Sequence, residues 1–121
     1  MSMELEILEY NESGYKPLVS YNGWRVAVAN PAPKWVDGQL TYMERHLLTD
    51  EVFVLLLGDA ALYIGDRRER YELEIGKVYC VKKGVWHNMA LGAGAKMLIV
   101  ENDDTCKDNT EYCDFKKNTE N

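Results

Sequence analysis

The chain has 121 residues, of which 46% are hydrophobic and 28% charged, and its formal net charge is −6 at pH 7. This length and balance are typical of one globular domain, and an acidic chain without a basic cluster excludes nucleic-acid binding. The longest apolar run, at residues 52–57, is too short to cross a membrane, so no membrane partner is expected.

The N-terminal sequence MSMELEILEY is acidic and lacks the basic and apolar blocks of a signal peptide. A cytoplasmic location is therefore expected. The three cysteines, Cys80, Cys106 and Cys113, are odd in number and their spacing fits no common zinc motif. Reduced thiols, rather than a disulfide framework, are expected in that compartment.

Short apolar or alternating runs, separated by Gly, Asn and Pro, predict a single all-β domain of the jelly-roll or barrel type. The predicted strands cover residues 4–10, 24–29, 40–46, 51–57, 60–64, 71–75, 77–81, 86–91 and 96–101. We assign residues 1–105 to the barrel with its N-terminal strands. Residues 106–121 are polar and are interpreted as a C-terminal tail that is partly packed or frayed.

The strand at residues 52–57 is apolar on both faces, so both faces are expected to be covered. One face would line the barrel interior, and the other would pack on a neighbouring sheet or on a second subunit. Trp24 and Trp35 are further candidates for the core or for a subunit interface. These features favour a homodimer.

Ionisable side chains gather in two short stretches of the chain. Residues two apart on a strand share a face, so Tyr42, Glu44 and His46 are expected to point the same way. A short loop then allows Glu51 to stand across from His46, and His87 closes the second stretch. Two histidines with one or two carboxylates suit a divalent ion such as Fe, Mn, Co, Ni or Zn.

The two stretches resemble the two sequence motifs of the cupin superfamily, in particular its small single-domain bacterial members. The first, G-x5-H-x-H-x3-4-E-x6-G, matches in spacing at Gly38, Glu44, His46, Glu51 and Gly58. The second, G-x5-P-x-G-x2-H-x3-N, matches at Gly76, Gly84 and His87. This resemblance implies the cupin-type double-stranded β-helix and a metal held by His46, Glu51 and His87.

The chain departs from the cupin motifs at three positions. Glu44 replaces the first histidine, Lys82 the proline and Leu91 the asparagine. Glu44 therefore occupies a ligand position with a different ligand type, and it is a candidate metal ligand, catalytic base or hydrogen-bond acceptor. The candidate pocket-wall residues are Tyr42, Phe53, Tyr79 and Trp86.

The resemblance implies more about the fold than about the activity, because one fold hosts many chemistries. The first hypothesis is a metal-dependent enzyme acting on a small polar organic molecule, by isomerase, epimerase or dioxygenase chemistry. The second is a non-catalytic protein that binds a small ligand, with a structural metal or none. The third is a metal-free barrel that keeps the residue pattern.

Overall fold

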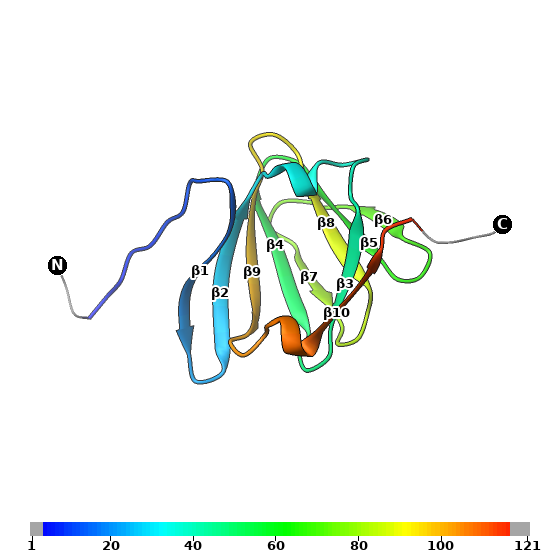
Figure 1. The fold of residues 1–121 in the computed structure, drawn as a ribbon. Coiled ribbons are helices and arrows are strands. Elements are labelled where there is room, and N and C mark those ends of the chain that lie inside the picture. Colours follow the sequence, from blue (N-terminus) through cyan, green and yellow to red (C-terminus); the bar gives the residue numbers. More distant parts are fainter. Residues whose placement is uncertain (1–3, 117–121) are drawn as a thin grey trace.

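Two antiparallel β-sheets face each other in this structure, a computed structural model that describes residues 4–116. The elements in chain order are β1 (Gly14–Tyr21), β2 (Trp24–Asn30), the 3-10 helix η1 (Pro33–Trp35), β3 (Tyr42–His46), β4 (Glu51–Leu57), β5 (Ala60–Ile64), β6 (Glu69–Glu72), β7 (Val78–Val81), β8 (His87–Leu91), β9 (Lys96–Asn102), the 3-10 helix η2 (Lys107–Asn109) and β10 (Thr110–Asp114). The first sheet has the order β1-β2-β9-β4-β7, and the second has the order β10-β3-β8-β5-β6 (Figure 1). No helix within residues 4–116 has the length and apolar character of a membrane span.

The hydrophobic core lies between the two sheets. Buried and partly exposed residues alternate along β4 and β9, as expected for strands that bury one face more deeply than the other. The core includes Phe53, Leu55, Met97 and Ile99 from the first sheet and Leu62, Met89 and Leu91 from the second. The predicted all-β jelly-roll architecture is therefore confirmed.

Most of the predicted strands are present, and the differences lie near the chain ends. Every predicted strand between residues 24 and 101 is found, although the one expected at 71–75 forms earlier, as β6. The strand predicted at 4–10 is wrong. This segment points away from both sheets (Figure 1) and leaves Leu5 and Ile7 exposed, because its alternating residues meet no partner strand within residues 4–116.

Two strands were not predicted from the sequence. β1 contains Pro17, a residue that weakens a strand prediction, and the pairing of β1 with β2 shifts register between Pro17 and Val19. As an edge strand, β1 can accommodate that proline. β10 is polar in sequence but pairs along its whole length with β3, so the segment interpreted as a polar tail contributes a strand to the second sheet. Residues 117–121 lie outside the described part of the chain.

The outer face of the first sheet carries two apolar rows that run across β2, β9, β4 and β7. The strand registers place Val26, Val100, Val52 and Cys80 in one row, and Val28, Leu98, Val54 and Val78 in the other. Val28 is buried and the other members are partly or fully exposed. The second face of β4 is thus apolar, and no neighbouring sheet within residues 4–116 supplies the cover predicted for it. A second subunit remains the predicted cover.

Gly58 forms the turn between β4 and β5 at a close approach of two backbones. Its φ of +74° lies in the left-handed region, and a Cβ placed there would stand 2.8 Å from the Cα of Ala95. Both features require glycine at this turn. Gly38 also has a positive φ, +84°, but open space surrounds the position of its missing Cβ.

Candidate metal centre

Four ionisable side chains meet between the two sheets: those of Glu44, His46, Glu51 and His87. Glu44 and His46 point the same way from β3 because they are two residues apart. Glu51 is the first residue of β4 and His87 the first of β8, where it pairs with Glu44 across the two strands. The site is therefore built at strand ends.

Backbone contacts fix the two turns that carry this site. The Gly84 amide donates a hydrogen bond of 2.8 Å to the carbonyl of His46, which ties the turn before β8 to the end of β3. Asp50, at the end of the loop between β3 and β4, accepts hydrogen bonds from the Lys83 amide at 2.7 Å and from Lys82 Nζ at 2.8 Å. Lys82, which stands in place of the motif proline, thus links the two turns.

The four side chains are close enough to share one ion. One ligand atom from each lies within 4.8 Å of the others. Glu51 Oε1 is 2.9 Å from His46 Nε2 and 2.8 Å from His87 Nε2. Glu44 Oε2 lies farther out, 3.9 Å from His87 Nε2. The three buried residues therefore form a tight centre, with Glu44 at its more exposed side.

The second nitrogen of each imidazole is held by a neighbour. His87 Nδ1 donates to the carbonyl of Val85 at 3.0 Å, and His46 Nδ1 lies 2.9 Å from Thr110 Oγ1. Both Nε2 atoms consequently face the centre. His46 Nε2 is buried there and, despite its closeness to Glu51, has no well-oriented hydrogen bond to any residue that the structure describes. Outer contacts of this kind are typical of metal-binding histidines.

Burial and close charges shift the pKa values at the centre. Burial would lower the pKa of both histidines, but the Glu51 and Glu44 carboxylates raise it above the ordinary value. Burial would raise the pKa of Glu51, but contacts with His46 and His87 together lower it. For Glu44 burial dominates, and the pKa is raised. The centre therefore favours an ionised Glu51 next to a positive charge, either on the imidazoles of His46 and His87 or on a bound cation.

These residues fit a divalent cation. Two imidazole nitrogens and one or two carboxylate oxygens suit Fe, Mn, Co, Ni or Zn. A buried nitrogen without a hydrogen-bond partner is costly in an apolar interior, and a bound cation would satisfy it. The structure brings together all four residues that the sequence proposed as ligands.

Comparison with known proteins identifies the fold. No protein-family model matches the chain, and no curated protein matches it. Among solved structures, a cupin-2 domain containing protein from Shewanella frigidimarina is 21% identical, with a TM-score of 0.60, and the match covers 77% of this chain and 84% of that chain. A variant of Streptomyces Pac13 with uridine is 9% identical, with a TM-score of 0.66, covering 89% of this chain and 84% of that chain. The chain has the cupin fold.

A third cupin-like structure is that of KdgF from Halomonas, which is 11% identical with a TM-score of 0.57. That match covers 78% of this chain and 80% of that chain. Pac13 is described as a nucleoside dehydratase, so the cupin fold seen here also carries enzymes. At these identities the likeness is one of fold.

A cavity of about 330 Å³ is lined in part by the four residues of the candidate metal centre. Tyr42 and Phe53, two of the predicted pocket residues, line it. Tyr112 from β10 and Trp35 from η1 add further aromatic walls, and the rings of Tyr42 and Tyr112 lie 6.0 Å apart. The basic side chains that line the cavity are Arg25, Lys34 and Lys107.

The other two predicted pocket residues do not line this cavity. Tyr79 lines a separate groove with Leu62 and Val85, and its hydroxyl accepts a hydrogen bond from the Glu74 amide. Trp86 precedes His87 in the chain, so its ring points to the opposite side and stacks under the Arg45 guanidinium, 4.5 Å from its ring centre. Both residues help to build the cupin barrel around the site.

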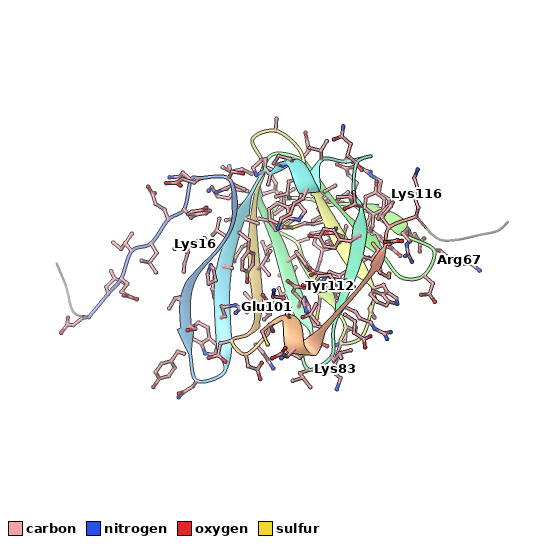
Figure 2. All side chains as sticks on the ribbon, viewed as in Figure 1. Lys16, Arg67, Lys83, Glu101, Tyr112 and Lys116 are labelled. Carbon is pink, nitrogen blue, oxygen red and sulfur yellow. The ribbon has the colours of Figure 1, made fainter. Side chains whose placement is uncertain are left out.

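Glu101, a buried carboxylate on β9, also lines the cavity and was not among the site residues predicted from the sequence (Figure 2). Its Oε1 atom lies 3.8 Å from His46 Nε2. Tyr15 Oη and Arg25 donate hydrogen bonds of 2.7 Å and 2.8 Å to its other oxygen, Oε2. The strand alternation could have indicated its burial, because Glu101 follows the buried residues Met97 and Ile99 at a spacing of two along β9.

Proposed function

We propose that this protein is a divalent-metal-dependent enzyme that moves a proton on a small polyhydroxylated molecule, as in an isomerisation or epimerisation. The observation that carries this proposal is the Glu44 carboxyl group, which lines the cavity and whose pKa is raised by burial beside the candidate metal centre. A raised pKa makes a carboxyl group a stronger base once it is ionised, and so better suited to taking up and returning a proton.

The roles follow from the position of each side chain. His46, Glu51 and His87 would hold the metal, since they are the most buried and most closely spaced. A bound divalent ion would polarise a carbonyl oxygen of the substrate and make the C–H group next to that carbonyl more acidic. Glu44, which reaches the cavity from the more exposed side, would take that proton and return it.

The cavity supports a ligand of modest size. Its volume of about 330 Å³ lies at the lower end of the range for small-molecule sites. Aromatic walls next to carboxylates and basic side chains suit a ligand with an apolar face and several polar groups. The fold similarity to Pac13, which was solved with uridine, supports a sugar or a nucleoside as the ligand.

Deuterium exchange tests the proposed reaction. The metal-loaded protein would be incubated in deuterium oxide with a panel of pentoses, hexoses and nucleosides, and carbon-bound deuterium would be followed by NMR. We expect incorporation with the wild-type protein. Glu44→Gln should slow it by about 100-fold or more, which is the usual contribution of a general base.

Metal content and oxygen uptake, measured in parallel, separate the alternatives. Glu44→Gln should keep its metal, because the other three ligands remain. Ligand binding without exchange would contradict the proposal and favour the non-catalytic binding protein. Oxygen consumption that depends on the ligand would contradict it in favour of a dioxygenase.

A further inference from the structure

Glu101 lines the cavity, and its two carboxylate oxygens differ in their hydrogen bonds. Its side chain is 4% exposed, and Oε2 accepts hydrogen bonds from both Tyr15 and Arg25. Oε1 is buried and has no hydrogen-bond partner among the described residues. Because two donors hold Oε2, the carboxylate group cannot turn Oε1 toward another partner without breaking the hydrogen bonds from Tyr15 and Arg25.

The burial of Glu101 Oε1 without a hydrogen-bond donor lowers the stability of the folded protein. A buried carboxylate oxygen without a donor loses its interaction with water and gains nothing in return. A ligand donor in the cavity would supply the missing hydrogen bond. The position of Oε1 therefore points to a polar group of the ligand.

Glu101 borders the candidate metal centre without belonging to it. Oε1 lies 3.8 Å from His46 Nε2, but Glu101 is not one of the four residues whose ligand atoms lie within 4.8 Å of one another. A ligand atom facing the metal centre and a second ligand atom facing Glu101 must consequently be near neighbours. This spacing is the one that adjacent substituents of a small molecule provide.

We propose that Glu101 is a specificity-determining residue that accepts a hydrogen bond from a hydroxyl group of the ligand, and that the ligand is a vicinal diol. This inference rests on the proposed function, because the first hydroxyl of the diol faces the metal centre. A hydroxyl donor suits this position because it also suits Arg25, which lines the same cavity and whose buried Nε has no acceptor among the described residues. A hydroxyl can both donate and accept.

Calorimetry with matched probes tests this inference. The probes are uridine, methyl β-D-ribofuranoside and 2′,3′-dideoxyuridine, titrated into the Zn(II)-loaded full chain. We expect uridine to bind about tenfold or more tightly than its dideoxy analogue, which is the effect of one hydrogen bond to a charged acceptor. Binding of the ribofuranoside would identify a sugar as sufficient, and binding of uridine alone would identify a nucleoside.

Three variants assign the preference to Glu101. Glu101→Gln should remove the preference for the diol and keep the metal content, because the amide presents a donor where the carboxylate presents an acceptor. Tyr15→Phe removes one of the two hydrogen bonds that hold the Glu101 carboxylate. It should reduce the preference for the diol while leaving the negative charge of Glu101 in place. Glu111→Gln changes an exposed acid paired with Arg45 and is the matched control, with no expected effect.

Several outcomes would overturn the inference. These are equal binding of the diol and dideoxy probes by the wild-type protein, binding of neither diol, and an unchanged preference in Glu101→Gln. Loss of the metal in Glu101→Gln, but not in the other two variants, would also overturn the inference, because it would indicate that Glu101 is a metal ligand. A wild-type protein that binds no metal but still prefers the diol, with the preference lost in Glu101→Gln, would contradict the proposed function and support Glu101 as the hydroxyl acceptor.

Discussion

The Nε2 atom of His87 lies 2.8 Å from the Oε1 atom of Glu51, while Nδ1 of the same ring donates its hydrogen to the carbonyl of Val85. A carbonyl oxygen can only accept, so Nδ1 carries the hydrogen in the neutral ring. The neutral ring then presents a lone pair at Nε2 to a carboxylate. A proton or a metal cation between the two atoms removes this repulsion, and a cation of the right size satisfies His46 as well.

The stability of the metal-free protein should depend on pH through these histidines. The pKa of His87 is raised in the folded state, so its protonation favours folding. That contribution is complete below the ordinary imidazole pKa of about 6.5 and is lost as pH rises through the folded-state pKa. Denaturation in urea should therefore show falling stability above about pH 6.5 without metal.

The metal-loaded protein should behave in the opposite way, because protons and the metal compete for the same nitrogens. Metal affinity, measured by competition with a chelator, should rise with pH through the same range. A pH-independent affinity between pH 5 and 8 would contradict the assignment of His46 and His87 as ligands.

Thr110→Val should weaken metal binding without touching the metal ligands. Thr110 Oγ1 lies 2.9 Å from His46 Nδ1 and helps to hold the ring in its orientation. Loss of such an outer contact typically lowers metal affinity by about 10 to 100-fold. Thr105→Val is the matched control, because Thr105 also lines the cavity but its buried hydroxyl has no hydrogen-bond partner among the described residues. Equal affinities in the two variants would exclude a role for Thr110.

Gly58→Ala should destabilise the barrel more than Gly38→Ala does. Both changes place an alanine at a positive φ, which costs about 1 to 2 kcal/mol. Only at Gly58 does the added Cβ also collide with the backbone of Ala95, and overpacking of this kind costs about 1 to 3 kcal/mol more. Urea denaturation measures both variants, and equal losses would argue against the close approach.

The homodimer expected from the sequence remains a prediction, and the two apolar rows on the first sheet are the surface on which to test it. Light scattering at micromolar concentration should give twice the 13.9 kDa mass of one chain. Val54→Asp, within one row, should reduce the mass to that of one chain. Leu48→Asp changes an exposed apolar residue outside the rows and should leave the dimer intact. A wild-type mass near 14 kDa would contradict the prediction.

The convergence of the four side chains could be predicted from the sequence, because short-range rules determine most of it. Strand alternation places Glu44 and His46 on one face, and a short loop returns the chain to Glu51. The position of His87 required the resemblance to the cupin motifs. His46 ends β3, while Glu51 and His87 begin β4 and β8. With the three residues at these strand ends, the barrel fold restricts their side chains to one common position.

The parts that the sequence did not predict depend on distant pairings. The hydrogen bond from Tyr15 to Glu101 joins residues 86 positions apart, through a strand whose proline obscured its pattern. Thr110 reaches His46 only because the polar strand β10 pairs with β3. Tyr79 faces the core, but from the edge strand β7, where it lines a separate groove. Trp86 lies just before the first residue of β8, so its direction depends on where that strand begins.

Elemental analysis of the untagged protein, purified without chelator, is the most direct test of the metal centre. It would be compared with the double variant His46→Ala/His87→Ala, with circular dichroism to establish that the variant is folded. We predict close to one divalent ion per wild-type chain and none in the folded variant. No bound metal in the wild-type protein, even after reconstitution with Fe(II), Mn(II), Ni(II) and Zn(II), would contradict the account, as would equal metal in both proteins.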